Sequence, residues 1–506
     1  MEWKEFETTF SVKLNQQQKE AVQSTKGPVL LLAVPGSGKT TVLVTRLGYM
    51  IYCRNIPPES ILTVTYTVAA TKDMSERFAV RFGEDMAKRL EFRTINGICA
   101  RIIQYYGRRI GKTPFELVKD EKTTTGMLIR ICQDHGMGYP TESDLKNVRT
   151  LITYIKNMML TEEELQKLEE ESDIRIAGIY REYCSQMRAQ NLMDYDDQML
   201  YAYKMLRMDP GLLAYFQKLY PYICVDEAQD TSKIQHAIIA LLATESGNLF
   251  MVGDEDQSIY RFRGATIENI LSFEEQFGAE VIKLEQNYRS TATILKAANA
   301  VIANNTQHKD KNLWSDLGDG DKIRMDRFST EQEEAMFITE RILDGVKQGK
   351  KYADHVILYR NNAQSRTVET TLAKSGIPYK IIGGVRFYER KEIKDIIAYL
   401  CVLNNNYDEV RFGRIVNEPV RGIGAATLDE LNRVVSGMGI SYVQAMCESD
   451  SLPSLSRKAK VLVPLGETFS ELSQHTDDIS DGSLIDDILD RFGYREAMQR
   501  QGLEGE

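Results

Sequence analysis

Short, largely apolar runs recur along the first part of the chain, and each ends in a turn or a polar junction. The runs cover residues 29–33, 61–65, 222–225, 249–252 and 281–284. Runs of this length between Gly, Pro and polar residues are typical of strands buried on both faces of a parallel sheet. Longer segments with helical periodicity separate several of them. The pattern therefore predicts an α/β fold.

The first run leads into a glycine turn and then a helix. The segment consists of Ala33, Val34, Pro35, Gly36, Ser37, Gly38, Lys39, Thr40 and Thr41. Glycines let backbone N–H groups approach phosphates, and the helix dipole favours negative charge there. Lys39 can reach the β- and γ-phosphates, and the Thr40 hydroxyl can ligate Mg²⁺. This predicts a phosphate loop, although Ala33 stands where the usual pattern has Gly; a chance turn before a helix is the alternative.

Two carboxylates follow the run 222–225, in the segment DEAQD. Asp226 can hold the Mg²⁺ set by Thr40, and Glu227 can orient and deprotonate an attacking water. A nucleotide hydrolase needs both near the γ-phosphate. The alternative is an exposed acidic turn, which a preceding buried strand disfavours.

Four further side chains are candidates for contact with the nucleotide. Gln18 can read an adenine edge, because an amide both donates and accepts, although a plain surface role is the commoner one. Gln257 follows the run 249–252 and can sense the γ-phosphate. Tyr288 can stack on adenine, and Arg289 can pair with a phosphate.

Aromatic, polar and basic groups at other strand ends suit contact with single-stranded DNA. The candidates are Tyr66, Thr94, Asn96, Tyr260, Phe262 and Arg263. Ligands gather at the carboxyl ends of strands in α/β sheets, and base stacking is tolerant of sequence. For Tyr66, an ordinary loop–helix junction is an equal alternative.

The segment 116–193 changes to a helical pattern and predicts an insertion into the α/β domain. Its acidic run at 161–173 is interpreted as a solvated helix face. Asp194, Asp196 and Asp197 follow, and a helix-capping turn is a better interpretation of them than a metal cluster.

Composition sets outer limits on these hypotheses. The chain has 506 residues and a net charge of −10, which excludes a wholly basic nucleic-acid binder but not a local DNA groove. Its seven cysteines form no C-x-x-C pair, so we expect no zinc site or disulfide framework and a cytoplasmic location. No run approaches the ~18 apolar residues of a membrane span, and the N-terminus lacks a signal-peptide pattern.

Taken in order, these motifs resemble the UvrD/Rep/PcrA family of superfamily 1 DNA helicases. The matching segments are LNQQQ (14–18), AVPGSGKT (33–40), VTYT (64–67), VDEAQDT (225–231), VGDEDQSIYRFRGA (252–265), QNYRST (286–291), LYRNNAQSR (358–366), IPYKIIGGVRFYERKEIKD (377–395) and RGIG (421–424).

The resemblance implies two RecA-like P-loop NTPase domains, each with an insertion. The first ATP-binding domain would be 1–115 and 194–283, with the helical insertion at 116–193. Part of the second would be 284–379, followed by its partial insertion at 380–506. The family also implies ATP, Mg²⁺, and 3′–5′ translocation on single-stranded DNA with unwinding at junctions with duplex.

By the same resemblance, Gln18 and Tyr288 would bind adenine. Gln257 and Arg289 would contact the γ-phosphate and link hydrolysis to motion, while Tyr66, Tyr260, Phe262 and Arg263 would line the single-strand path.

The chain departs from the family pattern at several places. Asn96 replaces a usual His, Phe262 replaces a usual Trp, and Val68 with Ala69 replaces a polar–basic pair. The late T-x-H-x-x-K-G motif and an arginine-bearing segment are not found in 396–506, so we expect an incomplete second domain. The chain would then be the N-terminal part of a longer helicase, or a truncated form with weak or no unwinding. A nucleotide-regulated module that binds single-stranded DNA without productive turnover is therefore the alternative function.

Overall fold

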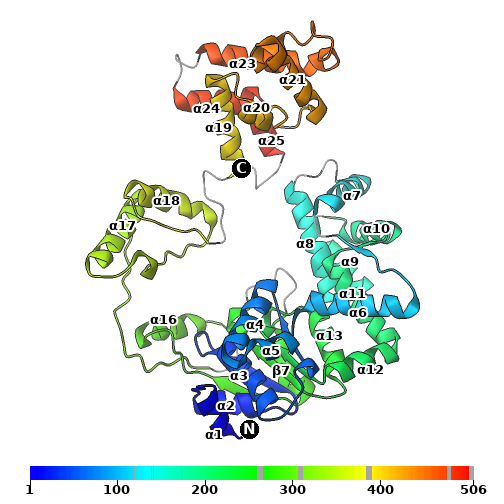
Figure 1. Cartoon of the computed structure of the whole chain (residues 1–506), viewed down its shortest axis with the longest axis vertical. Coiled ribbons are helices and arrows are strands. Elements are labelled where there is room, and N and C mark those ends of the chain that lie inside the picture. The colour runs from blue at the N-terminus through cyan, green and yellow to red at the C-terminus, as the bar shows by residue number, and fades with distance from the viewer. Residues whose placement is uncertain are drawn as a thin grey trace. The chain divides into compact units, whose positions relative to one another are not determined.

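The apolar runs of the first part of the chain form one parallel sheet in the computed structural model (Figure 1). The structure describes residues 1–118, 121–137, 140, 142–172, 174–258, 266–305, 311–382, 390–475 and 480–500. The chain divides into two compact units, Met1–Ile323 and Arg324–Glu506, and each is described by itself.

The sheet has six strands in the order β3-β2-β6-β7-β1-β8, with every neighbouring pair parallel. The strands are β1 (Val29–Ala33), β2 (Ile61–Thr65), β3 (Glu91–Thr94), β6 (Tyr222–Val225), β7 (Leu249–Gly253) and β8 (Glu280–Leu284). All five predicted runs are confirmed as strands. In the centre of the sheet Leu31 lies opposite Val252 on β7 and Ile282 on β8.

Side chains alternate between the two faces of the sheet, and helices cover both faces. Leu30 and Leu32 point to one core, whereas Leu31 and Ala33 point to the other. Each leucine side chain of β1 is fully buried, which contributes about 1.5–3 kcal/mol of transfer free energy per residue. The first core includes α6 (Ile95–Ile110), α11 (Tyr195–Met208), α12 (Pro210–Leu219) and α13 (Lys233–Ala243), and the second includes α1 (Trp3–Thr9), α2 (Gln16–Gln23), α3 (Lys39–Tyr52), α4 (Val68–Phe82) and α5 (Glu84–Arg89).

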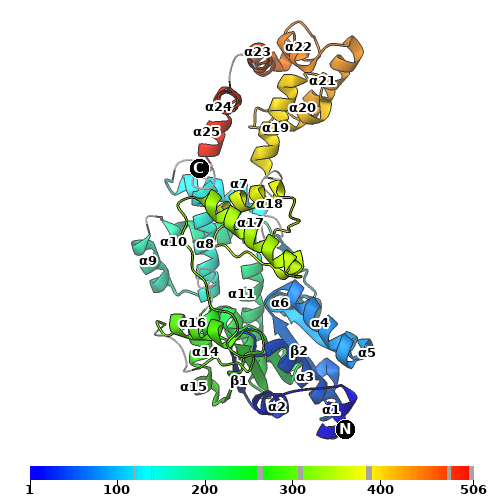
Figure 2. The same ribbon diagram turned by 90° about the vertical axis from the view of Figure 1, so that its left-hand side faces the viewer.

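The helical segment predicted as an insertion leaves the sheet domain and returns to it at neighbouring positions. There β4 (Glu116–Leu117) pairs in parallel with β5 (Leu192–Met193). Its helices are α7 (Glu121–Asp134), α8 (Glu142–Met158), α9 (Glu162–Glu171) and α10 (Ile176–Ala189). They share a core of their own, and α8 packs on α11 (Figures 1 and 2). The domain borders themselves stay a prediction.

The acidic residues that follow this segment cap a helix, as predicted. The Asp194 side chain accepts a hydrogen bond of 2.7 Å from the Asp197 backbone N–H at the start of α11. The fully buried ammonium of Lys156, on α8, also pairs with Asp194 at 2.6 Å and Asp197 at 2.8 Å. The capping turn therefore fastens the helical segment to the sheet domain.

The first unit ends with α14 (Glu268–Leu271), α15 (Phe273–Phe277) and α16 (Ala292–Ile302). In the second unit, α17 (Glu331–Lys347) packs on α18 (Ser365–Lys374). A separate core joins α19 (Lys391–Asn404), α20 (Glu409–Ile415), α21 (Ala425–Met438), α22 (Tyr442–Cys447), α23 (Ala459–His475), α24 (Asp481–Arg491) and α25 (Tyr494–Gln499). Among the described residues from 324 onward, none lies in a named strand.

The RGIG segment forms a turn before α21. The Arg421 guanidinium donates to the carbonyl oxygens of Ile415, Val416 and Phe492 and to the Tyr399 hydroxyl. This arginine side chain therefore ties the second unit's helical core together.

Candidate nucleotide site

Three groups of predicted site residues follow neighbouring strands. Strand β7 lies between β6 and β1, so their carboxyl ends meet at one edge of the sheet. The phosphate loop follows β1, Asp226 and Glu227 follow β6, and the loop 254–257 follows β7. Ligands of parallel α/β sheets bind at this edge.

The phosphate loop needs its glycines for conformation and for space. Gly36 and Gly38 have φ of +73° and +87°, in the left-handed region that favours glycine. A Cβ on Gly36 would lie 2.7 Å from Asn287 Nδ2, and one on Gly38 would lie 3.1 Å from Gln18 Nε2. Helix α3 starts at Lys39 with no side chain capping its first turn, which leaves backbone N–H groups for an anion.

Lys39 and Glu227 form an ion pair across the site. Lys39 Nζ lies 3.2 Å from Glu227 Oε2, and the lysine side chain is 14% exposed. Glu227 has φ +49°, a conformation that costs about 1–3 kcal/mol for a residue other than glycine. Its carboxylate also accepts a 2.8 Å hydrogen bond from Gln229 Nε2. Lys39, the predicted phosphate ligand, and Glu227, the predicted base, are therefore paired with each other in the structure.

Asp226 fits the role of a magnesium ligand. Its Oδ1 is buried and has no hydrogen-bond partner among the described residues. Burial and the neighbouring Glu227 raise the pKa of Asp226 to about 6, against the opposing effect of Lys39. A buried carboxylate oxygen of this kind suits a hard cation, and Mg²⁺ takes only one or two protein ligands beside phosphate and water. Asp226 and Thr40 would hold that ion.

The predicted adenine residues meet beside the phosphate loop. Gln18 is buried and donates through Nε2 to the Ser37 carbonyl at 2.9 Å. Asn15 caps α2, and its Nδ2 donates to the Tyr288 hydroxyl at 2.9 Å. Tyr288 is 48% exposed, which leaves it accessible to a base, and its backbone N–H donates to the Gly36 carbonyl at 3.0 Å.

Sequence reasoning missed Asn287 beside Arg289. Asn287 is buried, and its Nδ2 donates to the Pro35 carbonyl at 2.6 Å. Its Oδ1 accepts from the Arg289 N–H at 2.7 Å, while the Arg289 side chain is exposed. Asn287 thus connects the phosphate loop to the segment that carries Tyr288 and Arg289. Asn287 lies within the matching segment QNYRST, three residues after β8 ends at Leu284, and that segment is the signal in the sequence that could have pointed to it.

Gln257 lies in the acidic loop of the matching segment 252–265, and sequence reasoning did not predict the contacts of the acidic side chains. Its Nε2 donates to Asp254 Oδ2 at 2.7 Å. The Asp254 N–H donates in turn to Gln229 Oε1 at 3.0 Å. Because Gln229 also donates to Glu227, this loop is hydrogen-bonded to the carboxylate paired with Lys39.

Those of the predicted DNA residues that the structure describes follow β2 and β3, at the opposite end of the strand order from β1 and β8. Tyr66 follows β2, and β3 ends at Thr94, which lies opposite Thr65. Thr94 Oγ1 accepts from the Gly97 N–H at 3.1 Å and so caps α6. Asn96 Oδ1 is buried without a hydrogen-bond partner among the described residues. Tyr260, Phe262 and Arg263 lie outside the described residues, and the DNA-binding assignment stays a prediction.

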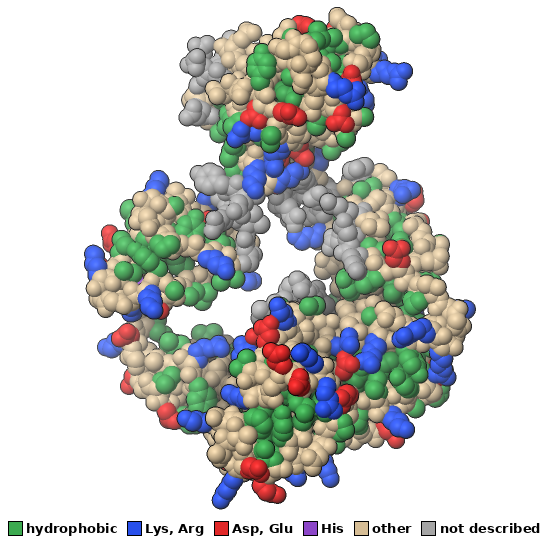
Figure 3. Space-filling view, viewed as in Figure 1, with side chains coloured by type: hydrophobic (Ala, Val, Ile, Leu, Met, Phe, Trp, Pro, Cys, Tyr) green, Lys and Arg blue, Asp and Glu red, His purple; other side chains and the backbone are tan. Residues whose placement is uncertain are grey.

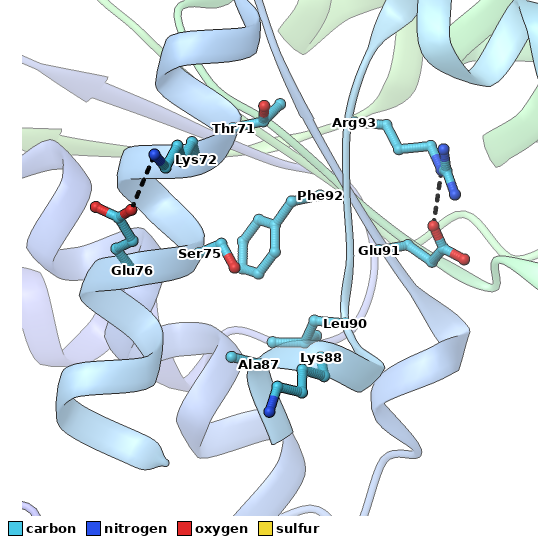
Figure 4. Close-up of a pocket in the computed structure, with 10 residues that line it drawn as sticks. All are labelled: Thr71, Lys72, Ser75, Glu76, Ala87, Lys88, Leu90, Glu91, Phe92 and Arg93. Carbon is cyan, nitrogen blue, oxygen red and sulfur yellow. Dashed lines mark hydrogen bonds and ion pairs between the residues drawn. The ribbon is translucent and has the colours of Figure 1, made fainter. Parts of the chain in front are cut away.

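The surface hollow in Figure 4 is separate from the nucleotide site. It has a volume of about 600 Å³ and lies between α4, α5 and the edge strand β3. Its Lys72 and Arg93 pair with Glu76 and Glu91, so these cations are partly neutralised. Charged groups of both signs are interspersed on the face of the first unit drawn in Figure 3.

A parallel sheet with a glycine phosphate loop and two acidic residues at a neighbouring strand end defines a P-loop nucleotide-binding protein. A protein-family model described as UvrD/REP helicase N-terminal domain matches residues 14–278. A second family model, described as UvrD-like helicase C-terminal domain, matches residues 282–453. The chain belongs to the UvrD/Rep helicase family. This confirms the resemblance drawn from its motifs and, with it, the RecA-like fold class.

Among curated relatives, the chain is similar to the ATP-dependent DNA helicase PcrA of Staphylococcus epidermidis, with 37% identity over 492 residues. That match covers 96% of this chain and 67% of the relative. PcrA of Leuconostoc citreum is 37% identical over 490 residues, with 96% and 65% covered. PcrA of Staphylococcus aureus is 36% identical over 492 residues, with 96% and 67% covered.

No helix within the described ranges is both long and apolar enough to cross a membrane.

Proposed function

We propose that this chain is an ATP-dependent DNA helicase that couples ATP hydrolysis to 3′–5′ movement along single-stranded DNA. The observation that carries the proposal is the meeting of Lys39, Asp226 and Glu227 at one sheet edge, in a chain of the helicase family. Its partners would be single-stranded DNA and junctions between single strand and duplex.

ATP binding would begin with an exchange of partners at Lys39. The β- and γ-phosphates enter the glycine loop, where backbone N–H groups and the dipole of α3 attract them. Lys39 then turns its ammonium from Glu227 to the phosphate oxygens. Asp226 and Thr40 would hold Mg²⁺, whose charge would offset that of the phosphates.

The same exchange would free Glu227 for catalysis. A carboxylate in an ion pair with a lysine is a weak base, because the positive charge stabilises its ionised form. Once Lys39 has moved to phosphate, Glu227 can orient the attacking water and take its proton. Gln229, already bonded to Glu227, keeps the carboxylate in place.

Contact with DNA would be made by stacking. Tyr66, Tyr260 and Phe262 supply faces for bases, and Arg263 supplies a charge for the backbone. Gln257 and Arg289 would respond to the γ-phosphate and link its loss to a step along the strand.

Strand displacement on tailed duplexes tests both direction and activity. The duplex carries a single-stranded tail of the same sequence at either its 3′ or its 5′ end, with ATP and Mg²⁺ present. Lys39→Ala is the control for ATP dependence. We expect unwinding of the 3′-tailed duplex only, and none with the variant.

Preference for the 5′-tailed duplex would reverse the proposed direction. Tight binding of ATP and DNA with no displacement and no hydrolysis would instead support the nucleotide-regulated binding module.

A further inference from the structure

One buried lysine lies against three carboxylates of the loop after β7. Lys311 Nζ is 2.6 Å from Asp254 Oδ1, 2.8 Å from Glu255 Oε2 and 3.2 Å from Asp256 Oδ2. The side chains of Lys311 and Asp254 are each 1% exposed. A buried charge is tolerated only when it is paired, so the lysine and the acidic loop depend on each other.

On one side, Lys311 is connected to the nucleotide site. The second oxygen of Asp254 accepts from Gln257 Nε2 at 2.7 Å, and the Asp254 N–H donates to Gln229. Gln229 bonds to Glu227, which pairs with Lys39. Polar contacts therefore run without a gap from the phosphate-loop lysine to Lys311.

On the other side, Lys311 belongs to the segment 311–316, which is hydrogen-bonded to residues 285–287 beside the predicted adenine residue Tyr288. The backbone carbonyl of Trp314 accepts from the Asn287 backbone N–H at 2.8 Å, and the Trp314 backbone N–H donates to the Glu285 carbonyl at 3.3 Å. Gln286 Nε2 donates to Asp316 at 2.9 Å. The chain then continues to Ile323, where the first compact unit ends.

We propose that Lys311 is a positioning residue that couples the nucleotide-sensing loop 254–257 to the segment 311–316. The inference rests on the proposed function, because it takes Gln257 as the γ-phosphate sensor. When the Gln257 amide turns to the γ-phosphate, Asp254 loses that hydrogen bond. Lys311 then keeps the Asp254 carboxylate neutralised and fixed, and the shift of the loop passes to the segment beyond Lys311.

The charge of Lys311, more than its volume, carries this role. The loop brings three carboxylates to one ammonium, and removing that charge leaves them to repel one another in a poorly solvated place. Without the lysine, the loop keeps its hydrogen bonds to Gln229 and Asn305 but loses the charge that holds its three carboxylates together, so Gln257 responds from a less fixed position. Arginine would keep the charge, whereas methionine would keep only the apolar length.

The chain offers a matched control in Lys156. Its side chain is likewise buried, and it pairs with Asp194 and Asp197 at 2.6 and 2.8 Å, in contacts that join α8 to α11. Lys156→Met removes a buried lysine with similar partners and leaves the loop 254–257 untouched. Loss of stability alone should therefore affect Lys156→Met and Lys311→Met alike.

The test compares hydrogen–deuterium exchange of peptides covering 254–258 and 311–316, with and without ATPγS. It uses the full chain and the variants Lys311→Met, Lys311→Arg and Lys156→Met, with kcat and KM for DNA-stimulated ATP hydrolysis measured in parallel. Asp254→Asn is a further variant, which leaves Lys311 two carboxylate partners.

In the unaltered chain and in Lys156→Met, we expect ATPγS to slow exchange in both peptides. In Lys311→Met the response of 311–316 should fall by about threefold or more, and kcat by about tenfold with KM little changed. Lys311→Arg should retain most of the exchange response of 311–316 and most of kcat, and Asp254→Asn should resemble Lys311→Met.

Two results would overturn the role of Lys311: no response of 311–316 to ATPγS in the unaltered chain, or the same response and kcat in Lys311→Met and Lys156→Met. A chain that shows the exchange response but hydrolyses no ATP with DNA would refute the proposed function and retain the coupling.

Discussion

The ammonium of Lys39 lies 3.2 Å from the Glu227 carboxylate, although the two residues are 188 positions apart. The sheet order brings them together, because β6 and β1 both flank β7. In the structure, the two charges that are central to the proposed mechanism neutralise each other. Under the proposal, the first effect of ATP binding is to separate this pair.

Removing the carboxylate of Glu227 should separate binding from chemistry. Glu227→Gln keeps the size of the side chain and its contact with Gln229, but it provides no base. We expect ATP affinity to stay within about threefold, whereas hydrolysis should fall by about 10²–10⁴-fold. Fluorescent-nucleotide titration and phosphate release measure the two quantities.

Glu84→Gln is the control for that experiment, because Glu84 forms an exposed pair with Lys88 on α5. It should hydrolyse ATP like the unaltered chain. Turnover of Glu227→Gln at the same level as this control would remove Glu227 from catalysis.

The phosphate loop should be more sensitive to added volume than other left-handed glycines. Gly36→Ala places a methyl group 2.7 Å from Asn287 Nδ2 and also strains a φ of +73°. Gly27→Ala strains a similar φ of +77°, but its methyl group meets nothing within 4 Å. The strain alone costs about 1–3 kcal/mol of unfolding free energy in both variants.

We expect only Gly36→Ala to weaken ATP binding, by about tenfold or more, because Asn287 must move and the loop with it. Thermal unfolding and nucleotide titration of the two variants provide the comparison. Equal affinities would show that the contact between Gly36 and Asn287 does not shape the nucleotide site.

The amide of Gln18 should determine nucleotide choice. Gln18→Ala removes the hydrogen bond to the Ser37 carbonyl and the group proposed to read adenine. The KM for ATP should rise about tenfold, and the preference for ATP over GTP should shrink. Gln16→Ala, on the exposed side of the same helix, should change neither. An unchanged ATP to GTP ratio in Gln18→Ala would assign adenine recognition elsewhere.

Asp196 should make stability depend on pH. Burial and the nearby Asp194 raise the pKa of Asp196 to about 6, from an ordinary value near 4. The folded state therefore binds this proton more tightly than the unfolded state does. The protonated Asp196 carboxyl stabilises the folded state below about pH 4, and this contribution is lost as pH rises through 6.

Asp196→Asn should remove that penalty, because the amide can still bond to Thr153 and Asn157. We expect the variant to gain about 2–3 kcal/mol of unfolding free energy at pH 8 and little at pH 4. Asp194→Asn should lose stability instead, since Asp194 pairs with Lys156. Urea unfolding at several pH values measures both. A constant difference across pH would contradict the raised pKa.

Local features were predictable from the sequence. The strands β1, β2, β6, β7 and β8 are each a short apolar run between turns, so their signal lies within a few residues. The glycine turn before Lys39 and the capping turn at Asp194 are also local, since the chemistry of adjacent residues decides both.

Long-range polar contacts were not predictable in this way. Lys311 meets Asp254 57 positions away, and Asn287 meets Pro35 252 positions away. Neither residue belongs to a periodic pattern, and its partner is fixed only by the order of strands in the sheet. The apolar pattern also did not predict that Val356 and Leu358 are 78% and 90% exposed.

The most direct test of the account is ATP hydrolysis by this chain, with and without single-stranded DNA, beside Lys39→Ala. The account predicts that DNA strongly stimulates hydrolysis and that the variant abolishes it, because Lys39 is the group that draws the phosphates into the loop. Hydrolysis that Lys39→Ala leaves intact, or that DNA does not change, would contradict it.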